Sequence, residues 1–194
     1  ILSLFNCKPF SEQPKYIADI ESENEIFLMK IIEIIKNKSL RGKVLYEYPI
    51  KVIGRSFIDK SFTESAEKIE GFSFIVVEGD IGNPAKVIEE LKESGIRDVE
   101  NILHVRAFSD HKRTYVPPVD TAAEKARSHA IIESAYTDKE GNSIETVSVI
   151  QSLVENFKQW EPLVGKYGLI NVEAHCPSLN VAQKYIDEFG SLHF

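Results

Sequence analysis

Five short apolar runs alternate with segments of helical spacing, and this alternation constrains the fold more than any other feature. Apolar residues recur every three or four positions in residues 25–39, 59–70, 83–95 and 145–166. The strand-like runs are YIADI (16–20), IKVIGRS (50–56), FSFIVVEGDI (72–81), ENILHVRAF (100–108) and YGLINVEAH (167–175). Strands that alternate with helices in this way form parallel sheets covered on both faces. The sequence therefore predicts an α/β fold with a mostly parallel sheet and helices on both faces.

Residues 112–146 interrupt this alternation between the fourth run and its helix. They contain YVPPVD, a short helical stretch, and SAYTDKEGNSIETV, in which DKEGN is typical of a β-hairpin tip. An insertion at this place lies where open α/β sheets bind their ligands, so we expect a lid.

The helix expected over residues 83–95 has recognisable end signals. Asn83 is the expected N-cap, Pro84 fits the first turn and Gly95 fits the C-cap.

The composition and charge of the chain limit the kinds of molecule that it is expected to bind. The chain has 194 residues and a formal charge of −7, with 43% hydrophobic and 27% charged residues. These values predict one soluble domain over residues 1–194 and disfavour nucleic acid or an anionic membrane as a primary partner. Two distant cysteines, Cys7 and Cys176, are expected to be reduced thiols in a cytoplasmic protein. An initial Ile1 and an apolar end at Phe194 favour an incomplete domain from a longer polypeptide.

Ligands of open α/β sheets bind at the carboxyl ends of the strands. In this chain those ends correspond to residues 19–25, 54–56, 78–82, 108–111 and 175–176. Every polar cluster of interest falls within or beside these short segments. We therefore expect the functional site at this edge of the sheet.

Asp80 and Ile81 follow the third run in VVEGDIGNP. An acidic side chain there is suited to accept hydrogen bonds from an exocyclic amine, while the isoleucine packs on a flat ring. The alternative is a capped turn in which Asp80 accepts hydrogen bonds from local backbone N–H groups. Both interpretations are compatible with the sequence.

The segment LHVRAFSDHKRTY after the fourth run is dense in ionisable residues. It could supply a general base, metal ligands or cationic anchors, or it could be a solvated polar loop. His104 lies within the strand and is expected to be a buried residue without a chemical role. If strands four and five are neighbours, about 4.8 Å apart, His111 and His175 converge. With Asp110 they would form a 2-His-1-carboxylate metal site, as in iron enzymes.

Three segments together resemble class I S-adenosylmethionine-dependent methyltransferases, most closely the type found in polyketide synthase assembly lines. They are FIVVEGDIGNP, ILHVRAFSDHKRTYVPP and VIQSLVENFKQWEPLVGKYGLINVEAH. The resemblance implies a Rossmann-like sheet in the order 3-2-1-4-5-7-6, in which strands four and five are neighbours. The last two strands would be missing after Phe194, so we expect another part of the polypeptide to cover the sheet edge.

The resemblance also assigns the cofactor residues. Asp19 matches the acidic residue that ends the first strand, and Asp80 with Ile81 matches the adenine-side pair. The glycine-rich turn would correspond to ESENE, with Glu21, Glu23 and Glu25 in place of its three glycines. The acidic residue that holds the ribose hydroxyls would fall at Arg55 or Ser56, neither of which is acidic.

These departures lead to three functional hypotheses. In the first, the chain is a pseudo-methyltransferase, a scaffold within a larger synthase that binds S-adenosylmethionine weakly or not at all. In the second, it is an active carbon methyltransferase for an acyl group tethered to an acyl carrier protein, assisted by iron or manganese. The resemblance then makes Asp110, His111 and His175 both the catalytic and the metal-binding candidates. In the third, it is an α/β binding module with an unrelated ligand.

Overall fold

The structure is a computed structural model that describes residues 1–20, 26–55, 72–110, 113–127, 129, 136–138, 140–173 and 184. The chain divides into two compact units. Residues 1–114 and 156–173 form the first unit, and residues 115–155 and 174–194 form the second.

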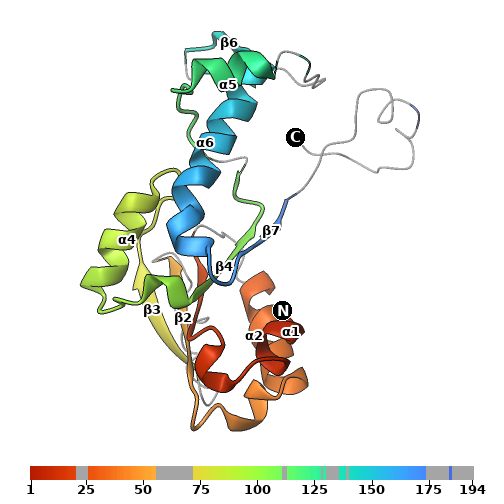
Figure 1. Ribbon diagram of the computed structural model, residues 1–194, viewed down its shortest axis with the longest axis vertical. Helices are drawn as coiled ribbons and strands as arrows, with labels where there is room; N and C mark the ends of the chain where they lie inside the picture. Colours follow the sequence, from red (N-terminus) through yellow and green to blue (C-terminus); the bar gives the residue numbers. More distant parts are fainter. Residues whose placement is uncertain are drawn as a thin grey trace. The chain divides into compact units, whose positions relative to one another are not determined.

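The first unit is built on a parallel sheet in the order β3-β2-β1-β4-β7 (Figure 1). Each neighbouring pair runs parallel. The strands are β1 (Tyr16–Asp19), β2 (Ile50–Arg55), β3 (Phe72–Val77), β4 (Ile102–Ala107) and β7 (Leu169–Val172). The predicted α/β fold is confirmed, and the five strands have the order expected for the first five strands of a class I methyltransferase.

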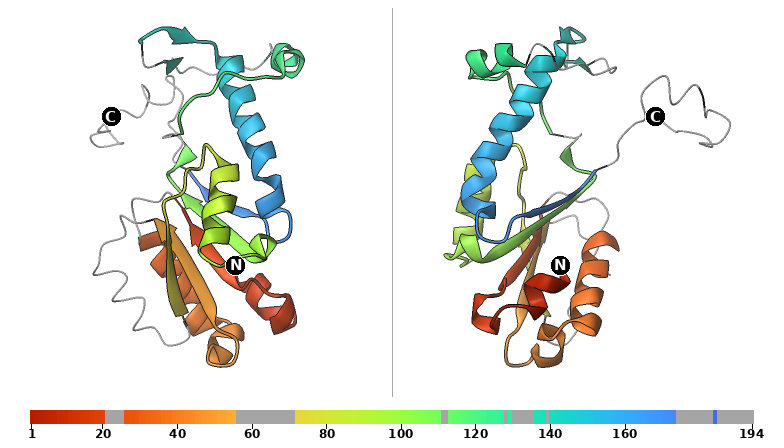
Figure 2. Two further views of the ribbon diagram at one scale, coloured as in Figure 1. Left: turned by 90° about the vertical axis from the view of Figure 1, so that its left-hand side faces the viewer. Right: turned by 45° about the vertical axis from the view of Figure 1, so that its right-hand side comes forward.

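Helices and 3-10 turns connect these strands in the first unit (Figure 2). They are α1 (Leu2–Asn6), η1 (Phe10–Glu12), α2 (Ile26–Lys38), η2 (Arg41–Val44), α4 (Pro84–Glu93), η3 (Val99–Asn101) and the later part of α6 (Thr146–Val164). None of the helices in the described part of the chain is long and apolar enough to cross a membrane.

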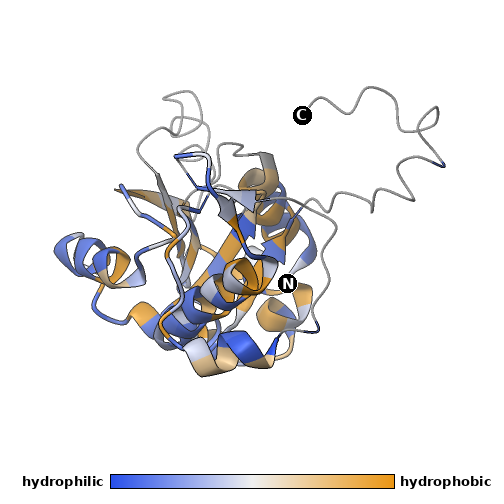
Figure 3. Ribbon diagram, turned by 90° about the horizontal axis from the view of Figure 1, so that it is seen from above, coloured by the Kyte–Doolittle hydropathy of each residue, from blue (hydrophilic) through white to orange (hydrophobic). Residues whose placement is uncertain are grey.

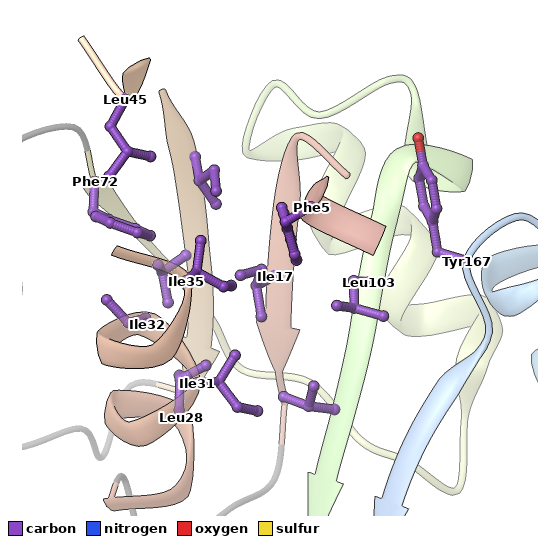
Figure 4. Close-up of a cluster of buried hydrophobic side chains, with 13 residues drawn as sticks. Phe5, Ile17, Leu28, Ile31, Ile32, Ile35, Leu45, Phe72, Leu103 and Tyr167 are labelled. Atoms are coloured by element: carbon purple, nitrogen blue, oxygen red, sulfur yellow. The ribbon is translucent and has the colours of Figure 1, made fainter. Parts of the chain in front are cut away.

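Alternate strand residues face opposite sides of the sheet, because successive side chains of a strand point in opposite directions. One face packs against α1 and α2 (Figure 4). Its buried residues include Phe5, Ile17, Leu28, Ile31, Ile32, Ile35, Val52, Leu103 and Val105. In α2 the buried face consists of Leu28, Ile31, Ile32 and Ile35, which recur at the three- and four-residue spacing expected of an amphipathic helix.

The other face packs against α4 and α6. Its buried residues include Ala18, Ile53, Val77, Ile81, Val87, Leu91, Ile102, Trp160 and Leu163. In Figure 3, hydrophobic residues are concentrated in the strands and on the helix faces that cover them. The predicted cap of α4 is confirmed, because the side chain of Asn83 accepts a hydrogen bond from the backbone N–H of Lys86. Gly95 has φ +85° just after this helix, a conformation that favours glycine.

Two predicted strand ends differ from the structure, and one predicted helix is not described by it. The third strand ends at Val77, because residues 78–82 turn toward α4 and do not continue the sheet. The fifth strand ends at Val172, so it does not extend to His175. The helix expected over residues 59–70 lies outside the described residues.

The second unit contains α5 (Thr121–Ala126), β5 (Tyr136–Thr137), β6 (Ser143–Ile144) and the first part of α6. The predicted hairpin is confirmed: β5 and β6 pair antiparallel, and the N–H of Asp138 donates to the carbonyl of Asn142. The carboxylate of Glu155 accepts hydrogen bonds from the N–H groups of Val119 and Asp120 at 2.9 Å each. Polar contacts thus attach the segment before α5 to α6 within this unit.

Candidate functional site

The carboxyl ends of the five strands meet at one edge of the sheet, as the sequence predicted. The register aligns Asp19 with Gly54 across β1 and β2, and Arg55 with Val77 across β2 and β3. Asp19 is only 3% exposed, so its carboxylate lies at the bottom of this edge. It occupies the central strand, between β2 and β4. We call the strand ends of β1, β2 and β3 the β1–β3 half of this edge, and the strand ends of β4 and β7 the β4–β7 half.

The turn after β3 carries Asp80 and Ile81. Asp80 is exposed, and its Oδ1 accepts a hydrogen bond of 2.7 Å from the N–H of Gly82. Ile81 is 1% exposed, and its carbonyl accepts hydrogen bonds from Asn156 Nδ2 at 3.1 Å and Trp160 Nε1 at 2.8 Å. This hydrogen bond matches the capped-turn alternative for Asp80, whose side chain is nevertheless exposed. Cofactor binding by this pair stays a prediction.

Gly79 is required at the start of this turn. It has φ +50°, and its N–H donates to Glu90 Oε2 at 2.8 Å. A Cβ atom at this position would lie 1.9 Å from Cγ2 of Ile20, the residue that follows Asp19. Only glycine allows the β3–α4 turn to lie so close to the end of β1.

Asp110 connects the ends of β4 and β7. Its Oδ1 pairs with Arg106 Nη1 at 3.1 Å, and its Oδ2 accepts a hydrogen bond of 2.5 Å from Asn171 Nδ2. Its backbone N–H donates to Glu173 Oε2 at 2.9 Å. The side chains of Arg106 and Asp110 are 3% and 9% exposed. We refer to these four residues, Arg106, Asp110, Asn171 and Glu173, as the Asp110 clamp.

Aromatic rings surround the buried end of this clamp. The guanidinium carbon of Arg106 lies 4.1 Å from the ring centroid of Trp160 and 5.9 Å from that of Phe157. His104 contacts Trp160 edge to face, with ring centroids 5.3 Å apart. Such contacts stabilise a desolvated cation, because the face of an aromatic ring carries negative potential.

His104 is buried within β4, as expected. Burial, and secondarily the nearby Arg106 cation, lowers the pKa of His104 to about 3. The imidazole is therefore neutral near pH 7. Among the described residues, its Nε2 has no hydrogen-bond partner.

Several predicted residues lie outside the described residues. They are Glu21, Glu23, Glu25, Ser56, His111, His175 and Cys176. Within the described part of the chain, no three His, Cys, Asp or Glu residues are arranged to hold a metal ion. Both side-chain oxygens of Asp110 accept a hydrogen bond, one from a guanidinium and one from an amide, and metal binding by Asp110 stays a prediction.

Sequence reasoning did not find the partners of Asp110 or the role of Trp160. Arg106 and Asp110 stand four residues apart, a spacing that could have suggested a local pair. Asn171 and Glu173 lie 61 and 63 positions after Asp110 in the sequence. Only the adjacency of β4 and β7 reveals these contacts.

Comparison with known proteins gives a family and little else. The model of the family described as the AprA MT2-like domain matches residues 1–194. No curated protein matches this chain. A crystal structure of a hypothetical protein from Mycobacterium tuberculosis is 11% identical, with a TM-score of 0.20. That match covers 91% of this chain and spans 58% of the other chain.

Proposed function

We propose the following function for this chain, which belongs to the AprA MT2-like family of methyltransferase domains. It is a methyltransferase-like module of a biosynthetic assembly line in which the S-adenosylmethionine site is impaired. The module then serves mainly as a scaffold within a larger polypeptide. The observation that carries this proposal is the segment ESENE at residues 21–25, which begins two residues after Asp19, the last residue of the central strand.

Glutamates in this turn oppose cofactor binding for two reasons. Glycine permits positive φ and a close approach of the backbone to the methionine part of the cofactor, whereas a side chain occupies that space. Carboxylates from Glu21, Glu23 and Glu25 would also repel the cofactor's own carboxylate at short range. Loss of the ribose acid at Arg55 or Ser56 removes charge-assisted contacts of about 1.5–3 kcal/mol. Together these effects weaken binding by several orders of magnitude.

The test is calorimetric titration with S-adenosylmethionine and S-adenosylhomocysteine. We expect no measurable heat of binding to the wild-type chain at millimolar cofactor. Restoring glycine at positions 21, 23 and 25 should lower the dissociation constant by at least about 100-fold, because repulsion and steric exclusion are both removed.

A matched control replaces three glutamates away from this edge, Glu47, Glu89 and Glu93, with glycine. This variant changes the net charge equally and should not acquire cofactor binding. Micromolar binding to the wild type would contradict the proposal, as would a triple-glycine variant that is folded and still does not bind.

An active carbon methyltransferase is the second candidate. It is favoured by membership in a methyltransferase family and by the exposed carboxylate of Asp80 at the end of β3. Its substrate would be an acyl group on an acyl carrier protein. A metal at His111 and His175, if bound, would supply polarisation of a β-dicarbonyl substrate toward its enolate. Asp110 would complete such a site, and its contacts with Arg106 and Asn171 would orient its carboxylate.

Metal content tests this second candidate independently of turnover. Protein purified anaerobically should then contain about one equivalent of iron or manganese by elemental analysis. His111→Ala and His175→Ala should each lose it, while His129→Ala, an exposed histidine of the second unit, should retain it. Metal-free wild-type protein would count against the iron- or manganese-assisted reaction.

The setting of the module is also a proposal. We place the protein in the cytoplasm, with other proteins as partners, and its formal charge of −7 argues against nucleic acid or an anionic membrane as a primary partner. The remainder of a larger polypeptide or synthase is the expected neighbour of β7, the edge strand on that side of the described sheet.

A further inference from the structure

Residues 115–119, Tyr-Val-Pro-Pro-Val, form an exposed apolar segment that the proposed function does not use. The segment leads into α5 and belongs to no helix or strand (Figure 1). It lies wholly within the described range 113–127 and within the second unit. Val116 is 54% exposed and Val119 is 86% exposed. Exposed apolar side chains that lie close together in this way are a feature of interaction sites.

Two consecutive prolines restrict the backbone of this segment to the polyproline II conformation. The ring of each proline fixes its own φ at about −65°. Each proline also disfavours the helical conformation of the residue before it, so Val116 and Pro117 are both extended. No backbone group of residues 115–118 is hydrogen-bonded to another described residue. This agrees with a polyproline II helix, which has no internal hydrogen bonds.

Side-chain burial along the segment repeats every three residues, which is the period of this helix. Tyr115 and Pro118 are half-buried, whereas Val116, Pro117 and Val119 are exposed. A polyproline II helix has three residues per turn, so residues three apart lie on one edge. Tyr115 and Pro118 therefore form the edge that faces the protein. Val116 and Val119 form one outward edge, and Pro117 lies on the other.

Contacts at the end of the segment hold it on the second unit. The carboxylate of Glu155 on α6 accepts hydrogen bonds from the N–H groups of Val119 and Asp120. The side chain of Asp120 in turn caps α5 by accepting a hydrogen bond of 2.9 Å from the N–H of Ala123. These contacts use backbone groups and leave the side chain of Val119 exposed. The segment is therefore ordered before a partner binds, which lowers the entropic cost of binding.

We propose that residues 115–119 are a docking segment for a partner domain with an aromatic-lined groove that recognises polyproline II helices. Grooves of this kind, as in SH3, WW and EVH1 domains, bind proline-rich segments whose backbone is already restricted. The segment carries no charged side chain, so apolar contact is what it offers a partner. The proposal is independent of the proposed function, because it requires neither the cofactor nor an acyl substrate.

The probe is a panel of purified SH3, WW and EVH1 domains, each titrated with the whole chain and followed by biolayer interferometry. At least one domain should bind, and a decaproline peptide should displace the chain, because both occupy the same groove. The double variant Val116→Ser/Val119→Ser should weaken this binding at least about tenfold by removing two apolar contacts. Leu40→Ser is the matched control, because Leu40 is 50% exposed but belongs to the first unit. It should not change binding.

A second variant separates a polyproline II ligand from a surface that is merely apolar. Pro117→Ala/Pro118→Ala keeps both valines but frees the backbone, so the segment must be ordered when it binds. Binding should then weaken about threefold or more. Both double variants should keep the circular dichroism spectrum of the wild type, since the segment belongs to no helix or strand.

Any of four results would overturn the proposal. They are a panel in which no domain binds the wild-type chain, unchanged affinity in the valine variant, unchanged affinity in the proline variant, and equal weakening by Leu40→Ser. Resonance shifts of the Val116 and Val119 methyl groups with S-adenosylhomocysteine, without binding to the panel, would assign the segment to a lid instead. Because calorimetry with the cofactor reports on the β1–β3 half, failure of the impaired-cofactor proposal would be recognised separately.

Discussion

Asp110→Ala is expected to destabilise the domain by about 3–5 kcal/mol, because it removes a carboxylate that pairs with the buried cation of Arg106 and bridges β4 to β7. Arg106 is 3% exposed in this pair and lies against the ring of Trp160. Urea unfolding should show a lower midpoint with an unchanged m-value. The double variant Arg106→Met/Asp110→Ala should recover much of the loss, since an apolar side chain needs no partner there.

The matched control is Lys15→Ala. Lys15 pairs with Asp98 at 2.9 Å, but the two side chains are 54% and 31% exposed. An exposed pair contributes about 0–1 kcal/mol, because water competes for both charges. If Asp110→Ala cost no more than Lys15→Ala, the clamp would not hold β4 and β7 together as described. Unchanged stability of the Asp110→Ala protein would show that Asp110 is not needed for folding, and would favour a chemical role for this residue.

The second large effect is acid destabilisation by His104. Its pKa is about 3 in the folded protein, against about 6.5 in an unfolded chain. Below pH 6.5 the unfolded state binds a proton that the folded state does not, so stability falls as the pH decreases from 6.5 toward 3. The shift corresponds to a loss on the order of 4–5 kcal/mol across this range. Above pH 7 the stabilising contribution of the neutral His104 is fully present.

His104→Leu should remove this part of the acid sensitivity, because leucine fills a similar volume and does not titrate. Because other groups also contribute to the pH dependence, the informative quantity is the difference between wild type and variant. The free energy of unfolding should be measured from pH 7 to pH 4. His129→Leu, at an exposed histidine, should retain the wild-type dependence. Parallel curves for wild type and His104→Leu would contradict the prediction.

Local patterns predicted much of the fold. Each strand and helix requires only a few consecutive residues to show its spacing, and the cap at Asn83 needs only the residues up to Lys86. The hairpin at Asp138–Asn142 likewise followed from turn residues. The strand order came from the family resemblance, since no local spacing specifies which strands become neighbours. The ends of strands three and five were less accurate, because an apolar run continues into the following turn.

The sequence by itself determined that this chain builds a parallel α/β sheet, and it has glutamates at positions 21, 23 and 25, where the family resemblance places a glycine-rich turn. Both properties can be recognised from short stretches of consecutive residues. Only the tertiary structure decided that Asp110 is held by Arg106, Asn171 and Glu173, that Trp160 donates to Ile81, and that Phe108 is exposed with positive φ. The physical reason is that these contacts depend on the adjacency of β4 and β7 and on the helix packed over them, which brings together residues 61 to 79 positions apart.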